Sequence, residues 1–140
     1  MRVRSVVTGS HRGVPRRRLA LLARRVVVGE NANLDVQIIF AGDLLLRDLN
    51  RRYRRKNRTT DVLSFNIPGV TGLRAESGEI YISLPQARRQ ARSVRQPLAC
   101  ELERLVVHGT LHLLGFDHHR KAEAERMRQR EHRYLGRPLA

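Results

Sequence analysis

The sequence is poor in cysteine, in aromatic residues and in acidic residues, and it has no long hydrophobic run. Its 140 residues include a single cysteine, Cys100, and no tryptophan. A lone cysteine cannot form an internal disulfide, which favours a reducing compartment. No apolar run reaches about 18 residues, which excludes a transmembrane helix, and no segment joins a basic face to an aromatic-rich apolar one. We therefore expect a cytoplasmic protein without a membrane partner.

Acidic residues are outnumbered by basic ones, 13 to 28, and the formal net charge is +15. A potential of this sign attracts polyanions, so nucleic acid is the expected partner. The alternative is a solvated basic surface that reflects an arginine-rich composition. The first 29 residues contain many arginines and no acid. That composition is shared with organelle transit peptides, but the strand-like and helix-like patterns in this segment favour a folded structure.

The hydrophobic pattern predicts one α+β domain over residues 1–140, built from mixed α/β layers. Strands are expected at Val3–Val7, Asp35–Phe40, Val62–Ile67 and Glu79–Ser83. Helices are expected at Pro15–Val28, in a short segment from Asp43, from Ser83 to before Pro97, from Pro97 to Leu114, and roughly at Arg120–Tyr134. Residues 68–77 are expected to form an exposed loop. The helices should pack a sheet of three to four strands, with the apolar helix Leu98–Leu114 buried at the centre.

Three histidines gather at the end of this predicted central helix. His108 and His112 are four residues apart, so on a helix they share one face, with Cβ atoms about 5–6 Å apart. Gly115 can adopt the left-handed conformation that ends a helix, and the resulting turn can bring His118 to the same point. A lone histidine on an apolar helix is more often a hydrogen-bonded core residue. Three at this spacing favour a metal site.

The chemistry of the donor set indicates which kind of metal site this would be. Three imidazole nitrogens without a thiolate are typical of catalytic zinc, which keeps a fourth position open, and we expect one zinc ion per chain. The spacing also matches the ligand pattern of metzincin proteases, which carry a glutamate directly after the first histidine as general base. Gly109 occupies that position here. The spacing of the three histidines therefore still favours a metal site, whereas the missing glutamate disfavours a peptidase.

The segment His108–His118, which reads HGTLHLLGFDH, resembles the signature of the YbeY family. These are bacterial metal-dependent endoribonucleases that act in ribosomal RNA maturation and ribosome quality control. Leu49–Lys56 and Thr60–Phe65 are similar to the family's N-x-x-Y-R-x-K and T-D-V-L-S-F runs, and Gly78–Ile80 to its G-D-I. Glu79 replaces the usual aspartate, and Asn66 replaces a proline. The resemblance spans roughly residues 34–135.

This resemblance implies a ligand set, a catalytic residue and an activity. His108, His112 and His118 would be the zinc ligands, and Arg54 would be the basic residue facing the metal. The implied protein is a zinc-dependent endoribonuclease that matures the 3′ end of small-subunit ribosomal RNA. Single-stranded RNA is the expected substrate, because an unpaired backbone can bend into a small cleft while an A-form duplex is rigid. The ribosome or its small subunit would be the partner. The nucleophile can be water or the RNA 2′-hydroxyl, and no carboxylate base replaces the missing glutamate.

Two other functions remain open on the sequence. The first is a non-catalytic ribosome-assembly factor, in which a zinc-stabilised fold presents a basic RNA-binding face. The second is a zinc hydrolase of a small molecule, which the charge of +15 disfavours. A nuclease must lose its activity without the metal, whereas a binding protein needs only its fold and its charge.

Several residues near the histidines have two possible roles. Asp117 can orient a ligating imidazole or stabilise the turn. His119 is expected at the surface, because neighbouring side chains diverge. Glu101, two helical turns before His108, can contact the site or form a salt bridge. The basic run Arg51–Arg58 can bind phosphate, although most of its members are expected to be solvated.

Overall fold

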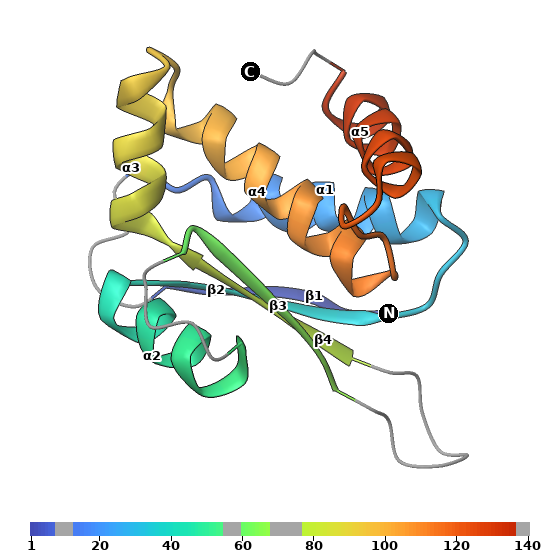
Figure 1. The fold of residues 1–140 in the computed structure, drawn as a ribbon, viewed down its shortest axis with the longest axis horizontal. Coiled ribbons are helices and arrows are strands. Elements are labelled where there is room, and N and C mark those ends of the chain that lie inside the picture. The colour runs from blue at the N-terminus through green and yellow to red at the C-terminus, as the bar shows by residue number, and fades with distance from the viewer. Residues whose placement is uncertain (8–12, 55–59, 68–76, 137–140) are drawn as a thin grey trace.

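The central element is one mixed sheet of four strands (Figure 1). The computed structural model describes residues 1–7, 13–54, 60–67 and 77–136, with only the backbone for residues 6, 7 and 54. The strands are β1 (Val3–Val7), β2 (Asp35–Ala41), β3 (Val62–Ile67) and β4 (Ser77–Ser83). Their order is β1-β2-β4-β3, with β3 alone antiparallel to its neighbour. Strands β1 and β3 are therefore the two edges.

Five helices pack on the sheet within the described ranges. They are α1 (Arg16–Gly29), α2 (Asp43–Arg54), α3 (Leu84–Ser93), α4 (Leu98–Leu113) and α5 (Lys121–Leu135). Figure 1 shows α2 on one side of the sheet and the other four helices on the opposite side. The predicted α+β architecture is confirmed. None of these helices is long and apolar enough to cross a membrane.

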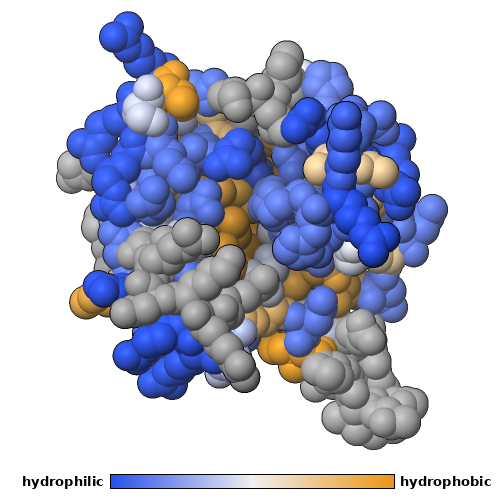
Figure 2. Space-filling model, viewed as in Figure 1, coloured by the Kyte–Doolittle hydropathy of each residue, from blue (hydrophilic) through white to orange (hydrophobic). Residues whose placement is uncertain are grey.

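The alternation of residues along the strands explains how the layers form. In β4, Gly78, Ile80 and Ile82 are buried beneath the helices, while Glu79 and Tyr81 point to the other face. The main core lies between this face and helices α1, α3 and α4. Most described surface residues on the side seen in Figure 2 are hydrophilic, and hydrophobic ones show mainly in a central recess.

Helix α4 is the buried central helix that its sequence predicts. It contacts α1, α3 and α5 as well as strands β3 and β4. Its buried residues occupy nearly all sides of the helix and include Leu102, Leu105, Val107 and Leu111. Because α4 is surrounded in this way, a side chain near its C-terminal end is held in a fixed position relative to the sheet.

Short-range signals in the sequence set most of the element boundaries. The Ser83 hydroxyl accepts a hydrogen bond from the Gln86 N–H at 3.2 Å and caps α3, as predicted. Strand β4 begins at Ser77, two residues earlier than predicted, because Ser77 pairs with Asp35 and Ile67 on the flanking strands. The rest of the predicted loop and residues 55–58 of the basic run lie outside the described residues.

Helix α4 approaches the sheet most closely at Gly109. A Cβ at this position would lie 2.8 Å from Ile80 Cγ2 and 3.1 Å from Ser64 Oγ. The Ile80 methyl group is attached directly to the β-carbon of a buried residue in β4 and has little freedom to move. Only a residue without a side chain allows this distance between helix and sheet.

We predict that Gly109→Ala lowers the free energy of unfolding by about 1–3 kcal/mol, because the added methyl group overpacks the interface between helix and sheet. Urea denaturation of the metal-free protein measures this change. Gly42→Ala is the matched control, since no atom lies within 4 Å of a Cβ built there. Equal stability of the two variants would contradict the close approach.

Candidate metal centre

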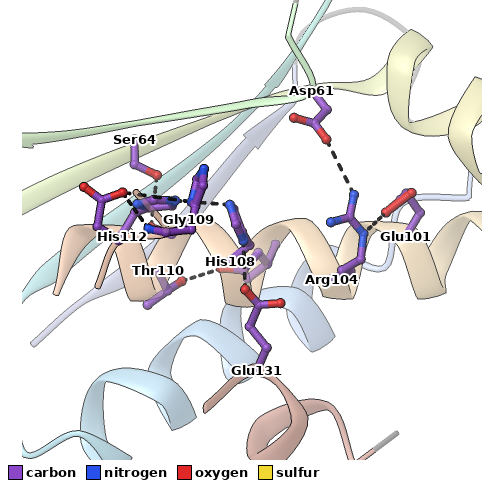
Figure 3. Close-up of polar contacts among 12 residues, drawn as sticks. Asp61, Ser64, Glu101, Arg104, His108, Gly109, Thr110, His112 and Glu131 are labelled. Carbon is purple, nitrogen blue, oxygen red and sulfur yellow. Dashed lines mark hydrogen bonds and ion pairs between the residues drawn. The ribbon is translucent and has the colours of Figure 1, made fainter. Parts of the chain in front are cut away.

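Helix α4 and the turn after it bring three imidazole rings together. His108 and His112 lie on one side of α4 (Figure 3), and their Nε2 atoms are 3.1 Å apart. Ring nitrogens of His108, His112 and His118 all lie within 4.8 Å of one another. The predicted convergence of the three side chains is confirmed.

The third histidine reaches the cluster through the turn at Gly115. Gly115 has a φ of +95°, a conformation that residues with a side chain rarely adopt. Its N–H donates to His112 O at 3.1 Å, and the Phe116 N–H donates to Leu111 O at 3.0 Å. These two bonds close the end of α4 and reverse the chain, so that His118 returns to the rings on the helix.

The donor set fits a metal ion. Two nitrogen ligands of a tetrahedral zinc ion lie about 3.3 Å apart, close to the separation of the His108 and His112 Nε2 atoms. The side chain of His118 is 56% exposed, whereas that of His108 is 22% exposed. The cluster is thus fixed on the helix side and accessible on the His118 side. The three residues can hold a metal ion that remains open to a ligand from solvent.

Glu131 of α5 contacts the cluster from the protein interior, a contact that the sequence reading missed. Its Oε1 lies 2.9 Å from Nδ1 of His108, and Glu131 is only 5% exposed. This contact favours the tautomer that carries its proton on Nδ1, so that the lone pair of Nε2 faces His112. Buried carboxyl groups hold metal-ligating histidines in this way in many proteins.

The cluster forms part of an open groove with a volume of about 550 Å³. Strand β3 contributes one wall through Val62, Leu63, Ser64 and Asn66, and α2 contributes Asn50. The Ser64 hydroxyl donates to Gly109 O at 3.0 Å and ties this wall to α4. Among the described residues that line the groove there is no lysine or arginine.

The two carboxyl groups that line the groove are both engaged. Asp61 lies 3.5 Å from Arg104 and accepts a hydrogen bond from Gln90. Asp117 accepts a hydrogen bond from the N–H of His118 at 2.7 Å, which lowers the pKa of the Asp117 carboxyl below its usual value. Asp117 therefore stabilises the turn, one of its two predicted roles. Its other carboxyl oxygen lies 3.2 Å from Nε2 of His119.

The remaining candidates from the sequence fall at the edges of the site. His119 is exposed at the surface, as expected. Glu101 is buried and forms a salt bridge with Arg104, so the salt-bridge role of Glu101 holds. Arg54 is the last residue of α2, and its side chain lies outside the described structure. The assignment of Arg54 as catalytic stays a prediction.

The α+β fold and the three-histidine cluster define a class of protein with a candidate metal centre, and comparison with known proteins gives the family. The sequence model described as Endoribonuclease YbeY matches residues 10–138. The chain belongs to the YbeY family. This agrees with the resemblance that the histidine segment carries.

Individual relatives agree with this membership. The chain is 44% identical over 100 residues to the endoribonuclease YbeY of Anaeromyxobacter sp. strain Fw109-5, a match that covers 71% of this chain and 52% of the relative. The Gluconobacter oxydans protein of the same name is 37% identical over 135 residues, covering 96% and 77%. The chain spans about half the length of the Anaeromyxobacter relatives.

A solved structure shows the same arrangement of elements. The solution structure of TM1509 from Thermotoga maritima matches with a TM-score of 0.61 at 26% identity. The match covers 96% of this chain and 89% of the other. Nearly the whole chain therefore takes part in the shared fold.

We predict that Glu131→Ala weakens metal binding about tenfold to a hundredfold, because His108 loses the group that fixes its ring. Competition with a chelator for added zinc measures the affinity. Glu131→Gln should recover part of the loss, since its amide oxygen still accepts a hydrogen bond from Nδ1. Glu125→Ala, an exposed position on the same helix, is the control. Wild-type zinc affinity in Glu131→Ala would exclude this role.

Proposed function

We propose that the protein is a zinc-dependent endoribonuclease that cleaves single-stranded RNA at the histidine cluster. The observation that carries the proposal is the convergence of three imidazole rings, within 4.8 Å of one another, in an open groove. Membership of a family described as endoribonucleases supports the reaction class. The charge of +15 supports a polyanionic substrate over a small molecule.

His108, His112 and His118 would hold the zinc ion. Nitrogen donors without thiolates suit zinc in a catalytic rather than a structural role. When bound, zinc supplies a Lewis acid that polarises a phosphoryl oxygen and activates a nucleophile. The protein contributes the fixed positions of the rings: α4 holds two of them, Glu131 orients His108, and the turn at Gly115 presents His118.

Arg54 would stabilise the negative charge that develops on the phosphate in the transition state. One observation supports this assignment: Asn50 lines the groove, and position 54 follows Asn50 by four residues in α2, the spacing that repeats on one face of a helix. A guanidinium can bind a phosphate group through two parallel hydrogen bonds.

The groove favours unpaired RNA. It is polar and open at the surface, and unpaired nucleotides can bend into such a space, while an A-form duplex is rigid. We extend the proposal, on the family resemblance alone, to maturation of the 3′ end of small-subunit ribosomal RNA and to ribosome quality control. The expected partner is the ribosome or its small subunit, and the expected location is the cytoplasm.

We predict that purified wild-type protein carries about one zinc ion per chain and cleaves a short unpaired RNA. His112→Ala should lose both the metal and the cleavage, because one of only three nitrogen ligands is removed. Elemental analysis and a gel-based cleavage assay give the two results. If His112→Ala loses zinc but still cleaves, the activity belongs to a contaminant or to another site. If the wild type binds RNA without cutting it, the protein is a non-catalytic assembly factor.

We predict that Arg54→Ala lowers the single-turnover cleavage rate on the order of 100-fold at saturating enzyme, with zinc content unchanged. An interaction made only in the transition state lowers kcat without raising KM. Arg54→Lys should recover only part of the rate, because an ammonium lacks the planar fork. Arg51→Ala is the control on the same helix, since Arg51 is exposed and pairs with Asp48. A wild-type rate for Arg54→Ala at saturation would reassign Arg54 to binding.

A further inference from the structure

Much of the positive charge of this chain lies in its N-terminal segment, outside the described lining of the groove. The first 29 residues contain eight arginines and no acid, so they carry +8 of the net +15. Helix α1 holds five of these arginines within its 14 residues. In contrast, the groove has no lysine or arginine among its described lining residues. A protein whose substrate is a polyanion would then have much of its attraction for that substrate outside the site of cleavage.

The arginines of α1 do not all have the same surroundings. Arg18 pairs with Glu103 at 2.7 Å, and Arg16 donates to Ser5 O at 2.8 Å. The other three, Arg17, Arg24 and Arg25, are exposed and have no acidic partner among the described residues. They share the outward side of the helix, opposite the buried Leu19, Ala23, Val26 and Val27.

This outer face of α1, defined by Arg17, Leu21, Arg24, Arg25 and Val28, has an unusual composition for a solvated helix surface. Exposed helix surfaces commonly carry both signs of charge. Here the face has no acidic residue, and its two apolar members, Leu21 and Val28, are 66% and 56% exposed. An anionic partner would pair with the three guanidinium groups and cover the apolar side chains.

The outer face of α1 lies near the sheet edge opposite the groove. Helix α1 packs on β1, whereas the groove is lined by β3, and these strands are the two edges of the sheet. Three strand spacings separate the edges, about 14 Å. An RNA just long enough to fill the groove leaves the outer face of α1 free, whereas a longer RNA can pass around the molecule and contact both.

We propose that the outer face of α1 is a second RNA-binding surface, which holds the phosphate backbone of a long RNA while another part of that RNA occupies the groove. The proposal rests on RNA being the substrate of the groove. Arginine suits this role because it binds phosphate in any sequence context and gives affinity without specificity. The surface would anchor the substrate and leave the chemistry to the histidine cluster.

The test compares two triple variants that remove the same charge. The first, Arg17→Gln with Arg24→Gln and Arg25→Gln, changes the outer face of α1. The second, Arg92→Gln with Arg95→Gln and Arg126→Gln, changes exposed arginines elsewhere. Each is measured for affinity over a range of salt concentrations with two probes, an unpaired RNA of about 30 nucleotides and one of about six.

The α1 variant is expected to bind the long RNA more weakly and to reduce the slope of log K against log salt by about two, since three phosphate contacts are lost. Its affinity for the short RNA, its zinc content and its rate of short-RNA cleavage should equal those of the wild type. The second triple variant should change the slope much less. Equal slopes for the two variants would overturn the proposal, because the effect would then come from net charge alone.

Other outcomes separate this proposal from the proposed activity. If the wild type cleaves the short RNA and the α1 variant binds the long RNA as tightly as the wild type does, the anchoring surface is overturned and the proposed nuclease activity stands. If long-RNA binding depends on α1 but no RNA is cleaved, the RNA-binding surface is supported and the proposed nuclease activity is overturned. If the α1 variant instead loses binding to phosphatidylserine-containing vesicles while RNA binding is unchanged, the surface binds membranes and the proposal is wrong.

Discussion

At Gly109, helix α4 lies so close to strands β3 and β4 that a β-carbon at this position would collide with the side chain of Ile80. This contact sets the height of the helix above the sheet, and the Ser64 hydrogen bond to Gly109 O fixes its position along the strand. His108 and His112 therefore stand at the edge of the groove facing β3. The same packing explains why this chain cannot use the glutamate of the metzincin motif. A carboxylate side chain at position 109 would have to enter the interface between helix and sheet.

The sequence predicts the parts of the site that depend on local geometry. Two histidines four residues apart share a helix face whatever the tertiary structure, and a glycine at the helix end permits a sharp turn. These two signals were enough to place three rings together. Strand and helix positions followed from periodicity in the same way. The strand order was not predictable, because pairing of β2 with β4 depends on contacts between segments about 40 residues apart.

The sequence did not reveal the partners of two buried carboxyl groups, Glu131 and Glu101. Glu131 lies 23 residues after His108, in a helix whose many charged residues give no sign that one of them is buried. From the sequence, Glu101 could contact the site or form a salt bridge, and in the structure it pairs with Arg104, three residues later on the same helix. In both cases a carboxyl group is buried with a specific partner, and the cost of burying a charge is offset only when such a partner is present. Periodicity records which residues are apolar and does not identify these pairs.

The site and the charge of this chain are arranged on different principles. A metal site needs rings held at fixed distances, and α4, the Gly115 turn and α5 supply them from the buried centre of the fold. Long-range attraction needs only exposed charge, which can lie on any surface and is felt over about 8 Å at physiological salt. Strands β1 and β3 keep these two requirements at opposite edges of one sheet. Among its described lining residues the groove has no lysine or arginine, so the Arg54 guanidinium that we propose there would act on the phosphate at close range, while the exposed charge of α1 needs no fixed geometry.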